Sequence, residues 1–364
     1  MVSRTLVRYF GMRFLGAVTS VFLGIFVLIV LVDYIELMRR AADIPNLSAW
    51  MVAKTSFFRV PQLTERLLPF SVLVGAMACY LALSRRNELV IARAAGMSAW
   101  QFVAPAVIVA FIIGIAATAL YNPISAAMRE ASKRLEAEIF GDKQMTSFQE
   151  SLTGFWVRQR SVDGQSIVYA ASSQEQGVRL DRVSVFTFDP AGHALERIEA
   201  KRATLEPGHW RLDQANVYVS GAPPRDYETY LVKTNLTAAQ VRESFSTPET
   251  VPFWDLPAYI EIAERSGLVA AGYKLQYQLL IARPFLLSAM VLLACSVSLR
   301  FFRFGGVARM VLSGIAAGFL LYVLSKVTED LSKAELLHPA AAAWLPVLAG
   351  GMTGFVVLLY QEDG

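Results

Sequence analysis

Six long apolar runs occupy the two ends of the chain and leave a polar stretch between the third and the fourth. Three runs are uninterrupted, and three have a charged residue at or near one end: the first group is Phe14–Val32, Phe102–Leu120 and Ala340–Tyr360, and the second is Leu67–Leu83, Pro284–Leu299 and Met310–Val327. Each is close to the roughly 20 residues that an α-helix needs to cross a bilayer. Charged side chains near helix ends can reach the interface. The pattern therefore predicts six transmembrane helices, with a separate short surface helix from Ala49 before the second of them.

The polar middle of the chain has the alternating pattern of β-strands. Six short segments are separated by turn signals rich in Gly, Pro and Asp: Phe155–Arg160, Gln165–Ala171, Arg182–Phe188, Leu195–Leu205, Trp210–Val219 and Tyr227–Asn235. Strands at this spacing, with no helices between them, are typical of an antiparallel sandwich, jelly roll or open barrel. We therefore predict transmembrane helices 1–3 in residues 1–140, an all-β domain in residues 141–250, and a connecting helix with transmembrane helices 4–6 in residues 251–364.

The basic residues of the short loops indicate the orientation in the membrane. With the N-terminus in the cytoplasm, that side holds Arg4, Arg8, Arg13, Arg85, Arg86, Arg93, Arg300, Arg303 and Arg309, and the opposite side holds Arg39, Arg40, Lys54, Arg59, Lys326 and Lys333. Cytoplasmic loops carry the excess of Lys and Arg in membrane proteins. The β-domain is therefore expected on the opposite side of the membrane.

One well-formed amphipathic segment, residues 84–98 with the sequence SRRNELVIARAAGMS, lies between the second and third apolar runs. As a helix it has a charged side made of Arg85, Arg86, Glu88 and Arg93, and an apolar side made of Leu89, Val90, Ile91, Ala94 and Ala95. Gly96 suits the end of a helix, and Ser98 with Gln101 fits a capping box that starts the next one. A segment held in this way can transmit force. Glu88 either meets a cationic groove on a partner or pairs with Arg85 within the helix.

Basic side chains also gather on the opposite side of the membrane. Arg39, Arg40, Lys133 and Arg134 are expected there, where guanidinium and ammonium groups either bind phosphorylated head groups or simply anchor the helices at the interface. Arg283 lies beside Pro284 near a span, where a charge is costly unless it is paired or hydrated. It either faces a cavity or pairs with Asp33 or Glu36.

The sequence carries no recognisable catalytic constellation. It has no GxxxxGK[ST] loop and no HExxH motif, its three histidines are scattered, and its two cysteines, Cys79 and Cys295, fall within apolar runs as small packing residues. A chain of this kind needs energy from a separate ATPase if it transports anything. The small-xxx-small patterns Gly314–Gly318 and Gly350–Gly354 permit close helix contact, either with a partner subunit or within this chain.

Several segments together resemble the lipopolysaccharide-export permeases of the LptF/LptG family, over nearly the whole chain. They are Arg86-Asn87-Glu88-Leu89-Val90, Ala95-Gly96-Met97-Ser98, Gly154-Phe155-Trp156-Val157 and Lys233-Thr234-Asn235-Leu236-Thr237. The first and last of these are more similar to the LptG branch than to the LptF branch. The resemblance implies an inner-membrane protein whose periplasmic β-domain is a jelly roll.

The resemblance also implies partners and roles. The chain would pair with an LptF-type permease, two copies of a cytoplasmic ABC ATPase of the LptB type, a single-span bridge protein of the LptC type and a periplasmic bridge protein of the LptA type. It would bind no cofactor of its own, since the ATPase uses the ATP. Glu88, with its neighbours Arg85, Arg86, Leu89 and Arg93, would contact the ATPase, and lipopolysaccharide would contact Arg39 and Arg40, the basic region of Lys133 and Arg134, and Arg283 in place of a family lysine that aligns with Asp33.

Other functions are open on the residues alone. The chain could be a permease for another envelope lipid or a lipoprotein, or a membrane scaffold whose β-domain binds envelope proteins. A membrane enzyme is disfavoured because no catalytic constellation is visible.

Overall fold

The computed structural model describes residues 4–42, 48–149, 155–161, 164–174, 178–189, 193–219, 223–234, 248–265, 270–302 and 307–363. These form two compact units. The first comprises Met1–Ser132, Pro252–Trp254 and Ala271–Gly364, and the second comprises Lys133–Val251 and Asp255–Ala270.

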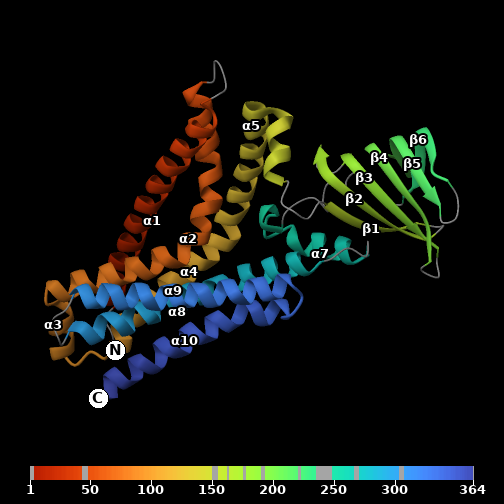
Figure 1. The fold of residues 1–364 in the computed structure, drawn as a ribbon. Coiled ribbons are helices and arrows are strands. Elements are labelled where there is room, and N and C mark those ends of the chain that lie inside the picture. Colours follow the sequence, from red (N-terminus) through yellow and green to blue (C-terminus); the bar gives the residue numbers. More distant parts are fainter. Residues whose placement is uncertain are drawn as a thin grey trace. The chain divides into compact units, whose positions relative to one another are not determined.

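The first unit is a bundle of long helices (Figure 1). In chain order they are α1 (Arg4–Arg40), α2 (Ala49–Arg85), the short α3 (Glu88–Ala94), α4 (Ala99–Ala116), the π-helical η1 (Ala117–Tyr121), the start of α5 (Asn122–Gln149), α8 (Ala271–Phe302), α9 (Val307–Lys333) and α10 (Pro339–Asp363). Six helices among the described residues are long and apolar enough to cross a membrane, with α4, η1 and the start of α5 forming one of them. The prediction of six spans is confirmed, and the chain is a multi-pass membrane protein.

The second span begins earlier than the sequence indicates. No separate surface helix precedes it, because α2 runs without a break from Ala49 and includes Pro61 and Pro69. Side chains donate hydrogen bonds to the backbone carbonyls at the first proline. Thr64 Oγ1 donates to the carbonyl oxygens of Val60 and Pro61, and Tyr121 Oη donates to the carbonyl oxygen of Pro61 at 3.1 Å. Such side-chain hydrogen bonds allow proline inside a membrane helix.

Small residues let the helices of the first unit pack closely. A Cβ added at Gly114 would strike the Cα of Pro284 on α8, and one added at Gly75 would strike the backbone of Val18 on α1. The two small-xxx-small patterns behave in the same way, since a Cβ at Gly314, Gly318, Gly350 or Gly354 would meet Met77, Leu73, Leu321 or Leu292, respectively. Of the two alternatives for these patterns, the structure shows contact within this chain.

The second unit contains one antiparallel sheet of six strands in the order β1 to β6 (Figure 1). The strands are β1 (Phe155–Ser161), β2 (Gly164–Gln174), β3 (Arg179–Phe188), β4 (Ala194–Glu206), β5 (His209–Val219) and β6 (Arg225–Lys233), followed by the helical turn η3 (Pro248–Thr250) and α7 (Leu256–Arg265). Every strand pairs with its neighbour in sequence, for example Phe155 with Ala170 and Trp210 with Val232. The predicted all-β insertion is confirmed, and the described strands make no Greek-key crossover of the kind that defines a jelly roll.

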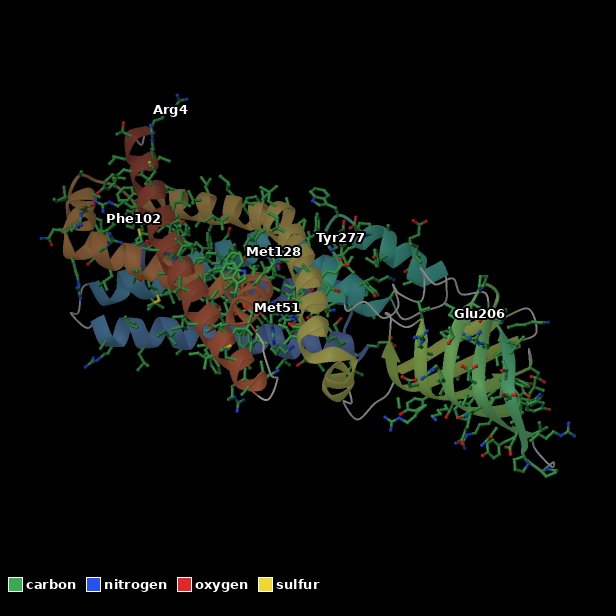
Figure 2. The ribbon with its side chains drawn as sticks, turned by 90° about the horizontal axis from the view of Figure 1, so that it is seen from above. Arg4, Met51, Phe102, Met128, Glu206 and Tyr277 are labelled. Atoms are coloured by element: carbon green, nitrogen blue, oxygen red, sulfur yellow. The ribbon has the colours of Figure 1, made fainter. Side chains whose placement is uncertain are left out.

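One face of this sheet forms an apolar core. Leu180, Ile198, Trp210 and Leu212 are among the fully buried side chains of the chain. The intervening residues carry charge, such as Glu206, labelled in Figure 2, which binds His209 and Arg211. Alternation of this kind is what a half-buried antiparallel strand requires.

Candidate functional site

Helix α3 occupies only the centre of the predicted amphipathic segment. It lies at the end of the bundle where α1 begins and α10 ends (Figure 1). The expected helix over residues 84–98 is wrong in length, because α2 continues through Arg85 and Asn87 then takes the left-handed conformation, with φ of 61°, before the seven residues of α3. The helix ends in a Schellman motif: Gly96, with φ of 81°, donates its N–H to the Arg93 carbonyl, and Met97 donates to that of Ala92.

The contacts of α3 divide it into an anchored side and an open side. Leu89 is only 2% exposed and belongs to the core of the bundle. At the far end of the segment, the Gln101 side chain accepts the backbone N–H of Ser98 at 3.3 Å, as the predicted capping box requires. In contrast, Val90 is 42% and Ile91 is 66% exposed. The short helix is therefore fixed to the bundle on one side while it presents two apolar side chains on the other.

Glu88, the first residue of α3, is bound by the first helix of the chain. Tyr9 Oη donates a hydrogen bond to Glu88 Oε2 at 2.9 Å, and Arg13 Nε donates to the same phenolic oxygen at 3.1 Å. The partner of Glu88 is thus Tyr9 and not Arg85. Tyr9 is 79 residues away, so the sequence does not predict its pairing with Glu88. Its only local signal is the spacing of four residues to Arg13, which puts both on one helix face.

Arg39 and Arg40 lie at the opposite end of α1 from Tyr9. Both bind the carboxylate of Glu36: Arg39 Nη2 is 2.8 Å from Oε2, and Arg40 Nε is 2.7 Å from Oε1. The Arg39 side chain is 76% exposed. Because one carboxylate is shared between two guanidinium groups, the cluster keeps a net positive charge and exposed N–H donors, which suit a phosphate.

Lys133 and Arg134 lie on α5, in the second unit. Lys133 is partly exposed, and the side chain of Arg134 lies outside the described residues. Their contact with a lipid head group stays a prediction.

Arg283 forms a buried ion pair with Glu65, which is 218 residues away in the sequence. Arg283 Nη1 is 2.5 Å from Glu65 Oε1, and the two side chains are 15% and 6% exposed. The carboxylate also accepts hydrogen bonds from Asn122 Nδ2 at 2.8 Å and from the Ser125 hydroxyl. Of the two alternatives for Arg283, the pairing with Asp33 or Glu36 is wrong. Both carboxylates bind other arginines. Asp33 lies 3.5 Å from Arg59, and Glu36 binds Arg39 and Arg40.

The same cluster holds the chain where it returns to the bundle. Asn122 Oδ1 accepts the backbone N–H of Phe253 at 2.9 Å, and Trp254 Nε1 donates to the Ala119 carbonyl at 3.1 Å. The Phe253 ring also stacks on Tyr277 of α8, labelled in Figure 2, with 5.6 Å between ring centroids. Residues 252–254 are thereby fixed to the first unit.

Comparison with known proteins decides the family. The family model described as "Lipopolysaccharide export system permease LptF/LptG" matches residues 8–360. The chain belongs to the LptF/LptG family. It is 23% identical to the lipopolysaccharide export system permease protein LptG of Haemophilus influenzae, over 98% of this chain and 97% of that protein. It is also 23% identical to the protein of the same name from Escherichia coli K12, over 93% of each chain.

As a member of this permease family, the chain is a transport subunit of the membrane. Within the described residues, no group of three or more His, Cys, Asp or Glu side chains is arranged to hold a metal ion. The polar groups of the membrane helices instead form paired clusters, at Glu65 and at Asp33. Such pairs hold helices together.

Proposed function

We propose that this chain is an LptG-type permease subunit of an ABC transporter, located in the bacterial inner membrane, which extracts lipopolysaccharide and passes it to a periplasmic bridge. Two copies of a separate cytoplasmic ATPase supply the energy, and an LptF-type permease is the second membrane subunit. Family membership and the two relatives named LptG support the class of cargo.

The observation that carries the proposal is the construction of α3. A separate ATPase needs a protruding element that is rigidly joined to the membrane helices, and α3 has both properties. It joins α2 to α4 through tight turns and buries Leu89, while Ile91 and Val90 remain exposed for a partner surface. Glu88 adds a carboxylate whose Oε1 accepts no hydrogen bond from the described residues. A cationic groove on the ATPase would bind this oxygen.

The basic residues beside α3 have a second role in this proposal. Arg85 and Arg86 are exposed and Arg93 is partly exposed. Exposed arginines steer association with an acidic rim and set its orientation more than they add affinity. Leu89 contributes indirectly, by fixing the helix that carries them.

The lipid is proposed to enter along the membrane faces that this chain leaves open. In the most apolar stretch of each span, only 6% of the residues of α1 and 22% of those of α9 are buried, compared with 61% for α8. These two helices therefore offer apolar surface to acyl chains and to the second permease. Arg39 and Arg40 end α1 with the charge that a phosphorylated head group requires.

Arg283 plays a different part from that of Arg39 and Arg40. Its guanidinium already binds Glu65 at 2.5 Å, so contact with a head group would leave the carboxylate partly unpaired. Contact with lipid through Arg283 is the weakest of the proposed contacts. The position that aligns with a family lysine, Asp33, is 8% exposed and faces Arg59.

Within the sheet, β1 and β6 are the edge strands that could accept a bridge protein. Each pairs on one side only among the described strands. An open edge can take up a strand from another protein through backbone hydrogen bonds. We propose this mode of contact for the LptC-type and LptA-type partners.

The decisive experiment is copurification from the native membrane in mild detergent, with ATP hydrolysis measured. The wild-type chain should copurify with an ATPase and a second permease. Glu88→Ala should either lose the ATPase or uncouple ATP hydrolysis from transport. Glu335→Ala is the matched control, because Glu335 is an exposed carboxylate in the turn between α9 and α10. If the wild-type chain purifies alone and Glu88→Ala changes nothing, the transporter proposal fails and a membrane scaffold takes its place.

A further inference from the structure

The hydrogen bond between Tyr9 and Glu88 joins two helices that are far apart in the sequence. Glu88 lies on α3, and Tyr9 lies in the second turn of α1. The bond is 2.9 Å long and is supported by Arg13, whose Nε donates to the phenolic oxygen while its guanidinium carbon lies 5.3 Å from the Tyr9 ring centroid. Since the phenol is a donor to Glu88 and an acceptor from Arg13, it links the acid and the base without a direct ion pair.

The neighbours of Tyr9 hold its ring in this position. Phe10 is 5% exposed and packs against Phe102 of α4, with 6.4 Å between ring centroids. The Tyr9 ring meets that of Phe10 edge to face at 5.7 Å. The buried Phe10 therefore fixes the start of α1 against the bundle and leaves the Tyr9 hydroxyl directed at Glu88. Phe102 is labelled in Figure 2.

Helix α1 is a suitable element to carry movement away from this contact. It is one continuous helix of 37 residues, and none of them is a proline. Tyr9 and Arg40 are separated by 31 residues, which corresponds to about 46 Å at roughly 1.5 Å per residue. An unbroken helix moves largely as a rod. A displacement of Glu88 thus reaches the exposed Arg39 and Arg40 through α1 itself.

The packing of α1 leaves it freer than the central helices. Only 6% of its most apolar stretch is buried, whereas the corresponding values for α2 and α8 are 56% and 61%. Phe10, Phe14 and Val18 hold its first half, and Asp33 and Leu37 hold its last turns. Between these points α1 contacts its neighbours through Phe22 with Tyr121, Phe26 with Phe57, and the Val30 carbonyl with the Ser56 hydroxyl. The described residues bury no other part of this stretch, so a shift there disturbs fewer contacts than a shift of α2 or α8 would.

We propose that Tyr9 is a positioning residue that ties Glu88 to α1, so that the movement of α3 driven by the ATPase is passed directly to the lipid-contacting end of α1. This rests on the proposed function. Tyr9 contacts neither the lipid nor ATP. Its hydroxyl maintains one connection between the element that the ATPase moves and the helix end that carries Arg39 and Arg40.

The test uses the complete transporter reconstituted in lipid vesicles that contain lipopolysaccharide, with lipid release and ATP hydrolysis measured together. Tyr9→Phe removes the hydroxyl and keeps the ring. Tyr34→Phe is the matched control, since it is the same change on the same helix at a residue with no recorded interaction among the described residues. Loss of one hydrogen bond to a charged acceptor predicts a decrease of at least about tenfold in lipid released per ATP hydrolysed.

The expected Tyr9→Phe complex assembles in normal yield and hydrolyses ATP at the wild-type rate, and only the ratio of release to hydrolysis falls. A purely structural role would lower the yield of the complex and leave this ratio unchanged. The inference is overturned if Tyr9→Phe releases as much lipid per ATP as wild type, or if it loses the ATPase altogether. Failure of the proposed function is distinguishable, because the wild-type complex itself would then release no lipid.

Discussion

Neutralising Glu65 should destabilise the membrane bundle by more than any surface charge change. The substitution Glu65→Gln keeps the length of the side chain, and its amide oxygen can still accept the hydrogen bond from Asn122. The charge that balances Arg283 is lost, however, and the Arg283 side chain is only 15% exposed. The variant therefore leaves a buried guanidinium without its counter-ion.

The magnitude follows from the burial and the geometry of the pair. Removing one partner of a buried ion pair costs about 3–5 kcal/mol. The residual hydrogen bonds of the glutamine put the cost of Glu65→Gln at about 3 kcal/mol, since a hydrogen bond to a charged group contributes about 1.5–3 kcal/mol. The double variant Glu65→Gln/Arg283→Gln should recover much of this loss, because two neutral amides can bond to each other and no charge stays buried.

The measurement is the midpoint of thermal unfolding in detergent, followed as the fraction of protein that remains monodisperse. A loss of this size should lower the midpoint by roughly 5–10 °C. Asp33→Asn is the control, because Asp33 is also buried in a membrane helix but lies 3.5 Å from Arg59, and its Oδ2 has no hydrogen-bond partner. A midpoint for Glu65→Gln within about 1 °C of wild type would refute the reasoning, since burial implies a cost of several kcal/mol. A double variant less stable than both single variants would refute it too.

Three further outcomes test other parts of the structure. Gly114→Val should disrupt packing between α4 and α8, because its Cβ would strike the backbone of Pro284, whereas Gly16→Val has open space and should leave the unfolding midpoint unchanged. Ile91→Asp should lower the copurification of the ATPase at least tenfold without lowering the unfolding midpoint, since this side chain is 66% exposed. An unchanged yield of ATPase would contradict the proposed contact between Ile91 and the ATPase. Partial burial and a neighbouring carboxylate raise the pKa of Tyr230 above its ordinary value. The folded state therefore holds this proton more tightly, and the resulting stabilisation is complete below the ordinary tyrosine pKa and disappears as pH rises through the raised one. Difference absorbance against Tyr230→Phe should show a phenol that titrates later than a free tyrosine.

Much of the candidate site can be predicted from local sequence patterns. Charged and apolar residues in a short stretch between two long apolar runs placed Glu88 on an exposed helix, and Ser98 with Gln101 placed the start of the next one. The length of that helix cannot be predicted in this way, because it depends on Asn87 adopting a left-handed conformation and on α2 continuing through Arg85. Asparagine tolerates that conformation but does not require it.

Local sequence patterns are sufficient to predict the elements of this protein: six spans, because helix length must match the bilayer, and six strands, because side chains alternate between the two faces of a sheet. Both patterns lie in consecutive residues, so they can be recognised without knowing which elements pack together. Which polar groups meet depends on the packing of the helices, since Arg283 binds a carboxylate 218 residues away and Glu88 binds a phenol 79 residues away. These partners are selected by the face that each helix turns towards its neighbours. That rotation is fixed by close contacts such as the one between Gly114 and Pro284, and no local pattern records it.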